Sequence, residues 1–496
     1  MRWTWSVVAA GLCGMAGCGP EAVGTSPAGS APEPLAASEA LPAPIAPGEE
    51  TETHSAPACS GPEGTAALAW SYVPRDDRAL EFTGTMDAEG NLYATECPRF
   101  WEGPVELRTC ELLSLGRDGS LRYRRPLSGT EYVHVDLSSG ERLYGTLNGA
   151  TARVSALAAA DGSLLWTTPL PPLLDAGCQW AWVSAPVLTP SHLVVAVHAT
   201  GERTACNALI ALDAATGAVA WQINAPERLS QPIADAQGHL YTSTFHWGQE
   251  QTELLSYTAG GTQRWRQTRA GHREPVAVSN GTLLLSTEEL ADAGTGGFRA
   301  TLGITGISHS RAEGELPFGP YPHGNVALGG KELLALADGR CTGASCPTEP
   351  HVSGQFFYGV DAASGALRWT LPVGDSPSAP LLTDRSTLLL VDRPVPEDCD
   401  FGCKGPDSYF DSYVHEFSQE GAERIACKLQ GQAPFVTPPA LHQGRLFLGA
   451  YLNWDSDNDG TPFLGIHAYE LDAPMSPARS GWVTEGGGNG REGQPQ

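Results

Sequence analysis

The stretch Ala211–Trp221, "ALDAATGAVAW", carries an aspartate, a Thr-Gly pair and a terminal tryptophan at fixed spacing. The apolar run that ends in Ala211-x-Asp213 has the pattern of a β-strand, and Thr216-Gly217 is a turn signal. Small residues then lead to Trp221. The stretch therefore predicts a β-hairpin whose second strand ends in a large aromatic side chain.

The same pattern recurs along the whole chain. Its aromatic or apolar end falls at Trp70, Tyr123, Trp166, Trp221, Trp265, Phe318, Trp369 and Ile425. The steps between these positions are 43 to 56 residues, and two further β-rich runs precede most copies. Four strands in about 50 residues make one blade of a β-propeller.

The terminal aromatic side chains are large enough to pack between neighbouring blades, where each buries some 150–250 Å². We therefore assign five tryptophans to blade docking: Trp70, Trp166, Trp221, Trp265 and Trp369. The spacing in Ala211–Trp221 resembles the tryptophan-docking motif of the PQQ-like β-propeller repeat, and Asp361, Ser364, Gly365 and Trp369 match it nearly as well. This resemblance covers residues 61–475 and implies an eight-bladed, quinoprotein-like propeller.

The two ends of the repeat array are incomplete. Trp70 belongs to a lone strand, whereas three strands without a fourth follow Ile425. Joining the N-terminal strand to these three would complete a last blade and remove the exposed edges of an open array. The expected fold is thus an all-β, eight-bladed propeller with four-stranded blades, closed by an N-terminal outer strand; an open β-solenoid is the alternative.

The N-terminal residues predict export and anchoring. Residues 1–17 have a positive Arg2 and a short apolar run, and Met15-Ala16-Gly17-Cys18 resembles the lipobox of bacterial lipoproteins, which implies cleavage before a lipidated Cys18. Gly19 favours the outer membrane, by the same resemblance. Residues 18–60 read as a disordered tether and 476–496 as a disordered tail. The alternative is a plain secretory signal in which Cys18 is incidental.

Charge and cysteine content agree with an exported protein. The net charge of −26, without a basic cluster, excludes nucleic acid as a partner, so membrane contact is expected only through the lipid anchor. Beyond Cys13 and Cys18, an even number of cysteines in an exported chain indicates disulfides. The predicted pairs are Cys97–Cys110, Cys178–Cys206, Cys341–Cys346 and Cys399–Cys403, with Cys59–Cys427 left by elimination.

The sequence shows no catalytic signature. Quinoprotein dehydrogenases, by the resemblance, hold the quinone against two adjacent cysteines that are bonded to each other, and this chain has no Cys-Cys pair. We therefore expect no enzyme activity and no cofactor. Asp455, Asp457 and Asp459, closed by Gly460, resemble the first half of a Ca²⁺ loop, but Ile466 stands where an EF-hand has glutamate. An acidic hairpin loop without metal is the alternative.

Long loops between the second and third strands of the blades would gather on one face. Apolar side chains fall in these loops and in a link between blades: Trp101, Trp180, Trp182, Phe410 and Trp454. They either anchor a partner or fold back over their own blades. We expect a monomeric, lipid-anchored scaffold that binds envelope proteins, by resemblance in outer-membrane protein assembly. The alternatives are a PQQ- and Ca²⁺-dependent dehydrogenase and a propeller that binds carbohydrate or another small ligand.

Overall fold

The computed structural model describes the chain between residues 64 and 477, with gaps. The described ranges are 64–75, 78–98, 109–127, 133–174, 178, 180–199, 206–246, 249–279, 282–292, 298–308, 316–317, 325–329, 333–338, 355–361, 367–373, 378, 380–392, 412–430, 437, 439–452, 463–471 and 474–477. All of them belong to the unit Ser55–Gln496. The expected Cys18 anchor and tether lie outside these residues, as does the expected tail beyond its first two residues, Ser476 and Pro477.

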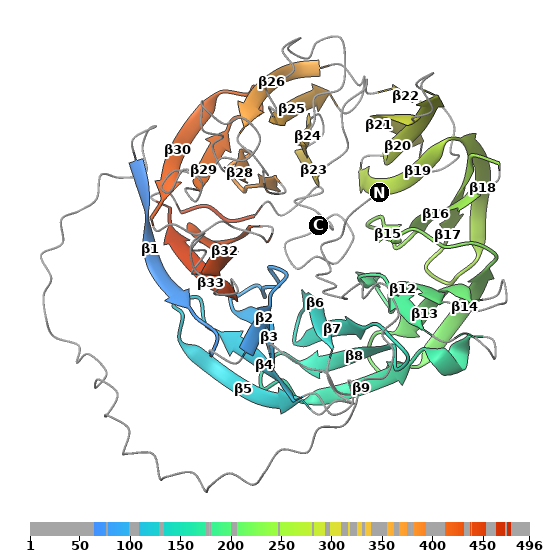
Figure 1. Ribbon diagram of the computed structural model, residues 1–496, viewed down its shortest axis with the longest axis horizontal. Coiled ribbons are helices and arrows are strands. Elements are labelled where there is room, and N and C mark those ends of the chain that lie inside the picture. Colours follow the sequence, from blue (N-terminus) through green and yellow to red (C-terminus); the bar gives the residue numbers. More distant parts are fainter. Residues whose placement is uncertain are drawn as a thin grey trace, which may run out of the picture. The chain divides into compact units, whose positions relative to one another are not determined.

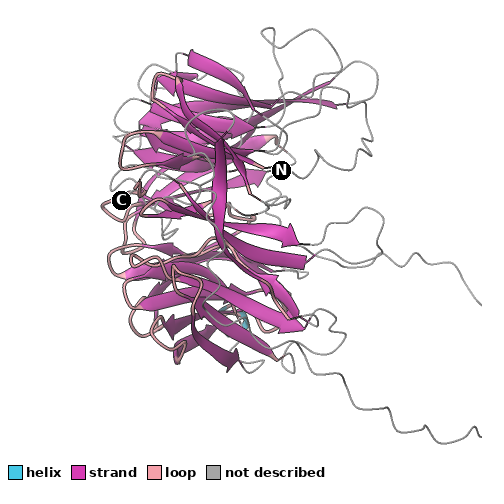
Figure 2. Cartoon of the chain, turned by 90° about the vertical axis from the view of Figure 1, so that its left-hand side faces the viewer, coloured by secondary structure: helices cyan, strands magenta, loops and turns pink. Residues whose placement is uncertain are grey.

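The regular secondary structure of the described residues is almost entirely β-strand (Figure 2). The exception is one short 3₁₀ helix, η2 (Pro171–Leu173). No helix in these ranges is long and apolar enough to cross a membrane. The predicted all-β class is confirmed.

Most strands form small sheets in which sequence neighbours pair antiparallel (Figure 1). The first three sheets are β2 (Arg78–Glu81), β3 (Leu92–Pro98), β4 (Cys110–Leu115) and β5 (Leu121–Leu127); β6 (His134–Ser139), β7 (Arg142–Leu147), β8 (Arg153–Ala158) and β9 (Leu164–Pro169); and β10 (Ala181–Val183), β11 (Val187–Leu188), β12 (His192–Ala199), β13 (Asn207–Asp213) and β14 (Val219–Ala225). The next three are β15 (Ile233–Ala234), β16 (Leu240–His246), β17 (Gln251–Tyr257) and β18 (Gln263–Ala270); β19 (His272–Ser279), β20 (Thr282–Asp292), β21 (Phe298–Ser308) and β22 (Leu316–Pro317); and β23 (Asn325–Gly329), β24 (Leu333–Asp338), β25 (Gln355–Asp361) and β26 (Leu367–Val373).

The remaining strands form one eight-stranded sheet, in the order β27-β28-β29-β30-β1-β33-β32-β31. Its strands are β1 (Gly64–Tyr72), β27 (Leu381–Leu382), β28 (Leu388–Asp392), β29 (Tyr413–Phe417), β30 (Glu423–Leu429), β31 (Ala440–His442), β32 (Arg445–Leu452) and β33 (Phe463–Glu470). It consists of two groups of four strands, β27–β30 and β31–β33 with β1. Eight blades are counted only if these two groups are taken as separate blades, and this number stays a prediction.

The sheets contact one another in sequence order and close into a ring. Inner strands make these contacts: β3 meets β6, β7 meets β10, β11 meets β15, β16 meets β19, β19 meets β23, and β23 meets β27. From the eight-stranded sheet, β33 contacts β2 of the first sheet. This closed succession of units, most of them four-stranded, is a β-propeller.

The ring closes through the N-terminal strand, as predicted. β1 pairs antiparallel with β33 from Ala67, opposite Glu470, to Tyr72, opposite Ile466. The indole of Trp70 lies 5.9 Å from the ring of Phe447 in β32. In Figure 1, β1 runs along the outside of the ring beside β30 and β33.

The repeat tryptophans dock on the hairpin of the next sheet. The indole nitrogen of Trp166 donates to the carbonyl oxygen of Ala214 at 3.3 Å. A Cβ atom at Gly217 would lie 2.5 Å from the Trp166 ring, and Gly217 has a φ of 72°. Glycine is needed there because any side chain would clash in a conformation that other residues rarely adopt. The Thr-Gly pair therefore receives the preceding tryptophan as well as making the turn.

The same geometry recurs at other junctions. In each case the indole N–H donates to a backbone carbonyl oxygen and the ring contacts a nearby glycine. Trp70 donates to Arg117 at 3.0 Å beside Gly119, Trp221 to Ala259 at 2.9 Å beside Gly261, and Trp369 to Gln419 at 2.8 Å beside Gly421. The weaker copy ending at Tyr123 keeps the bond, since its hydroxyl donates to the carbonyl oxygen of Ala159 at 3.1 Å. Trp70, Trp166, Trp221 and Trp369 thus each contact the hairpin of the next sheet. Trp265 contacts Tyr241 at 6.0 Å, and Phe318 lies outside the described residues.

Four of the inner strands share a feature that sequence reasoning missed. A Ser or Thr hydroxyl accepts the backbone N–H of the neighbouring strand, and proline stands two residues later, where no N–H is available. The pairs are Ser184 with Ala196 (3.0 Å), Ser230 with Ser243 (3.0 Å), Ser378 with Val391 (3.0 Å) and Thr437 with Gly449 (2.7 Å). The repeated Ser/Thr-x-Pro could have located these four inner strands.

Candidate binding surface

Two tryptophans stand out among the described residues because solvent reaches them. Trp180 is 49% exposed and Trp182 is 43% exposed, whereas the docked Trp166 is only 8% exposed. The other large apolar side chains that are as exposed are aliphatic: Val73, Leu121, Leu165 and Val219. The indoles of Trp180 and Trp182 are therefore candidates for contact with a partner.

The strand that carries these indoles is held on both sides. β10 pairs with β12 over Ala181–Val183. On its other side, Ala181 and Gly149 of the preceding sheet exchange backbone hydrogen bonds of 2.8 and 3.1 Å. The side-chain oxygen of Asn148 also accepts the N–H of Val183 at 2.6 Å. The tryptophans are thus presented by a segment fixed between two sheets.

A disulfide braces the same region covalently. Cys178 is bonded to Cys206 at the start of β13, across 28 residues of sequence. This pair and Cys97–Cys110 confirm two of the predicted disulfides. Rigid aromatic side chains lose little conformational entropy when a partner binds, so a braced indole pair suits a binding surface.

One of the two indoles has an internal partner. The ring of His198 in β12 stacks on Trp182 with 5.6 Å between centroids and 20° between planes. The His198 ring is held in turn by Asn207, whose side-chain oxygen lies 2.5 Å from His198 Nδ1. Trp182 therefore keeps a fixed orientation while nearly half of its surface stays in solvent. We define the Trp180–Trp182 surface as these two indoles with His198.

The other predicted members of the binding face cannot be placed against it. Trp101 falls in the sequence between β3 and β4, Phe410 between β28 and β29, and Trp454 between β32 and β33, all outside the described residues. The predicted Ca²⁺ loop with Asp455, Asp457 and Asp459 also lies outside the described residues. So do the pairs Cys341–Cys346 and Cys399–Cys403. Cys427 is disulfide-bonded, but its predicted partner Cys59 is outside the described ranges.

Polar networks that the sequence did not reveal sit in the inner turns. The hydroxyl of Tyr93 donates to Asp87 at 2.6 Å and accepts from Arg122 at 3.1 Å, and Arg122 also donates to Ser114 at 2.9 Å. A second network has the same geometry: Tyr241 with Asp235, and Arg264 with Tyr241 and Ser256. The shared "DA-x-G-x-LY" at 87–93 and 235–241 was the available signal.

These networks are structural. Burial, together with the neighbouring aspartate, raises the pKa of Tyr93 and of Tyr241, so both hydroxyls remain hydrogen-bond donors. Burial alone would raise the pKa of Asp235, but hydrogen bonds from His239 and Tyr241 lower it overall. Every member has a partner within the network. Within the described ranges, moreover, no three His, Cys, Asp or Glu side chains are grouped to hold a metal ion.

One buried histidine predicts a pH dependence of stability. Burial lowers the pKa of His467 to about 4, and its Nε2 has no hydrogen-bond partner in the described part of the chain. In the unfolded chain this histidine takes up a proton near pH 6.5. The stability that comes from a neutral His467 in the folded chain is therefore present above that pH and is lost as pH falls towards 4. Between pH 6.5 and 4 we expect the free energy of unfolding to fall by roughly 3 kcal/mol through this group.

The measurement compares urea unfolding of the wild type and His467→Leu across this pH range. The free energy of unfolding of the wild type minus that of the variant should fall by roughly 3 kcal/mol between pH 6.5 and 4, because only the wild type loses the contribution of His467. Parallel curves would show that His467 does not titrate with a lowered pKa.

Comparisons with known proteins agree with this architecture. Residues 150–318, less than half of the chain, match the family model described as outer membrane protein assembly factor BamB. No curated protein matches the chain. The solved structures that resemble it include BamB from Moraxella catarrhalis, at 12% identity and a TM-score of 0.41, which covers 82% of this chain and 100% of that one.

Enzymes appear among the similar structures as well. Quinohemoprotein alcohol dehydrogenase ADHIIG from Pseudomonas putida HK5 has 13% identity and a TM-score of 0.44, and covers 84% of this chain and 77% of its own. The β-propeller domain of the Trilobed protease from Pyrococcus furiosus has 8% identity and a TM-score of 0.42, with 70% and 97% covered. By its own closed ring of sheets the chain is a β-propeller, and its residues 150–318 match the family described as outer membrane protein assembly factor BamB.

Proposed function

We propose that this chain is a non-catalytic, lipid-anchored scaffold that binds proteins of the cell envelope through the Trp180–Trp182 surface. One observation carries the proposal: two indoles that are nearly half exposed project from a strand fixed between sheets and braced by Cys178–Cys206. Tryptophans of this kind dominate the binding energy of protein interfaces. The family match over residues 150–318 points to outer-membrane protein assembly as the setting.

The state of the repeat tryptophans supports a role without catalysis. A quinone cofactor needs a free indole face to stack on, but Trp166, Trp221 and Trp369 each donate to a neighbouring turn and lie against its glycine. The polar networks in the inner turns are satisfied internally. These observations favour the scaffold over the dehydrogenase. A Ca²⁺ ion at the Asp455 loop remains a prediction.

Photocrosslinking in intact cells tests the proposal. A photoreactive side chain at position 182 should give adducts with a component of outer-membrane protein assembly, which mass spectrometry identifies. The matched control is position 121, because Leu121 is 55% exposed but lies at the start of β5, beside the β4–β5 turn. With the purified partner, Trp182→Ala should weaken binding at least tenfold, which corresponds to about 1.4 kcal/mol.

Two results would contradict the proposal. Equal adducts at positions 121 and 182 would indicate unspecific labelling. An unchanged Kd for both Trp180→Ala and Trp182→Ala would remove these indoles from the interface.

A further inference from the structure

The Trp180–Trp182 surface has a chemical character that narrows the choice of partner. Ala181 is 1% exposed and Val183 is 8% exposed, and both belong to a buried cluster that draws on the second and third sheets. Trp180 and Trp182 alternate with them and therefore project away from this cluster. Two residues of an extended strand span roughly 6.6 Å, so the two indoles form neighbouring platforms.

Each indole is covered on one side and open on the other. Trp182 has the ring of His198 against it, at 5.6 Å between centroids. A Cβ atom at Gly149 would lie 3.6 Å from the ring of Trp180, so this indole lies beside the β7–β8 turn. The remaining surface of both indoles is in solvent, as their exposures of 43% and 49% show. They are flat apolar platforms that the protein holds in place.

The polar groups around the indoles are mainly hydrogen-bond donors. Within the described ranges, neither indole N–H donates to another residue. The side-chain oxygen of Asn148 accepts the N–H of Val183 at 2.6 Å, but its NH₂ group has no acceptor in that part of the chain. In the tautomer of His198 that donates from Nδ1 to Asn207, Nε2 adds one acceptor. Donors therefore outnumber acceptors on this surface.

A ligand that complements such a surface has acceptors, few donors and flat apolar groups. Proline-rich segments meet all three requirements, because proline has no backbone N–H, its carbonyl oxygen accepts, and its ring is apolar. They form the polyproline II helix without internal hydrogen bonds, so their carbonyl groups remain available. An ordinary extended peptide, by contrast, brings one N–H per residue, and a carbohydrate brings a donor with every hydroxyl group.

We propose that the Trp180–Trp182 surface binds an uncharged, proline-rich segment of its partner in the polyproline II conformation. This inference rests on the proposed function, because it names the part of an envelope protein that the scaffold recognises. Pyrrolidine rings pack on the open sides of the two indoles, while the N–H groups of the indoles and of Asn148 donate to carbonyl oxygens. At a rise of roughly 3.1 Å per residue, about three residues of the segment span the two indoles.

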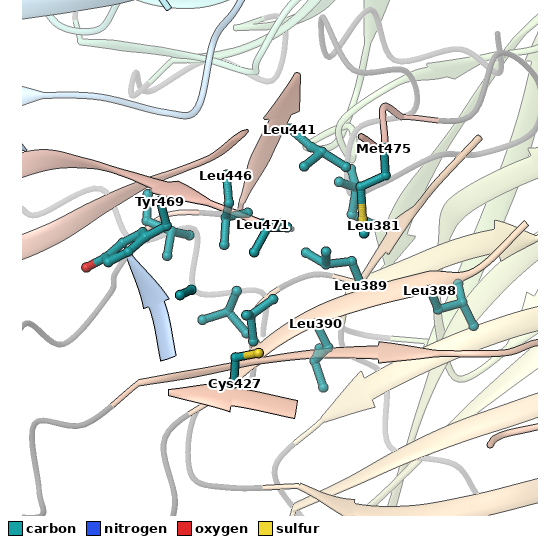
Figure 3. Close-up of a cluster of buried hydrophobic side chains, with 14 of the residues drawn as sticks. Leu381, Leu388, Leu389, Leu390, Cys427, Leu441, Leu446, Tyr469, Leu471 and Met475 are labelled. Carbon is teal, nitrogen blue, oxygen red and sulfur yellow. The ribbon is translucent and has the colours of Figure 1, made fainter. Parts of the chain in front are cut away.

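Both sides of this contact are formed before binding. The polyproline II helix loses little conformational entropy when it binds an aromatic surface, since its backbone is already ordered. The surface belongs to a closed ring, whose eight-stranded sheet packs around a buried cluster that includes Leu389 of β28, Leu446 of β32 and Met475 (Figure 3). A frame that is already closed keeps the entropic cost of binding low.

Binding of synthetic peptides to the purified full-length protein tests the proposal. The probe is a fluorescently labelled oligoproline peptide, the reference is a Gly-Ser peptide of the same length, and fluorescence anisotropy gives the Kd. We expect a Kd below about 1 mM for oligoproline and no saturable binding of the Gly-Ser peptide. An N-acetylglucosamine oligosaccharide, added as a competitor, should not displace the oligoproline.

Three substitutions examine the indoles and the amide separately. Trp180→Ala and Trp182→Ala should each weaken oligoproline binding at least tenfold, because each removes one platform. Asn148→Asp keeps an oxygen for the N–H of Val183 but removes the N–H donors, so it should weaken binding several-fold. Leu121→Ala is the matched control, because Leu121 is 55% exposed but lies on β5, and it should leave the Kd unchanged.

Several results would overturn the proposal. Equal affinity for the two peptides would show that proline is not recognised, and an unchanged Kd in both tryptophan variants would place the binding elsewhere. Displacement of oligoproline by the oligosaccharide would assign the surface to carbohydrate. If oligoproline did not bind at all, this inference would fail, and adducts at position 182 in cells would then show that the scaffold function stands without it.

Discussion

Replacing Trp166 by alanine should lower the free energy of unfolding by roughly 3–5 kcal/mol, the range for a large aromatic side chain removed from a packed interior. The indole is 8% exposed, donates to Ala214 and fills the space above Gly217. Its loss leaves a cavity between two sheets that the rigid hairpin cannot fill. Urea denaturation followed by circular dichroism measures the change.

Trp182→Ala is the matched control for this substitution. The same atoms are removed, but Trp182 is 43% exposed and stacks on only one histidine. We expect a loss below about 1 kcal/mol, as for surface positions. Losses of equal size in the two variants would mean that indole docking does not hold neighbouring sheets together.

The repeat was predictable because its signals are local. A strand, a tight turn and a terminal aromatic lie within eleven residues in Ala211–Trp221, so a single stretch shows the hairpin and its docking residue. The incomplete copies at the two ends then predicted closure by the strand of Trp70, which pairs with β33. Even the weak copy ending at Tyr123 keeps its bond to the next hairpin.

Features that depend on distant partners escaped prediction. The parallel pairing of Gly64–Ala66 with β30 covers three residues and has no periodic pattern in the sequence. The networks of Tyr93 and Tyr241 unite side chains from three strands.

The candidate surface was predictable in part. Sequence reasoning singled out Trp180 and Trp182 as loop aromatics but could not decide between a partner site and local packing. Trp182 does pack, against His198, and still keeps 43% of its surface exposed. Local packing thus fixes the orientation of an indole that remains available, so the two alternatives are combined in one side chain.

A second large effect is expected from Arg124→Met, which removes the main partner of a buried carboxylate. Glu96 has a side-chain exposure of 0% and forms an ion pair with Arg124, while Tyr72 of β1 donates to the same carboxylate. Breaking a buried pair costs roughly 3–5 kcal/mol, and because Arg75 also lies 3.5 Å from Glu96, we expect a loss at the lower end of this range. Because Tyr72 also accepts from Arg124 at 2.7 Å, the variant should loosen the end of β1 as well. Urea denaturation and hydrogen exchange of residues 64–72 report the two effects.

The double variant Glu96→Met/Arg124→Met distinguishes a lost charge partner from lost packing. Removing both charges should recover at least about 2 kcal/mol relative to Arg124→Met, because the buried carboxylate that has lost Arg124 is gone. Arg445→Met is the control for an exposed pair, since Glu470 is 45% exposed, and should change stability by less than about 1 kcal/mol. If the double variant were as unstable as the sum of its single substitutions, the packing of these side chains, and not their charges, would join β1 to the first sheet.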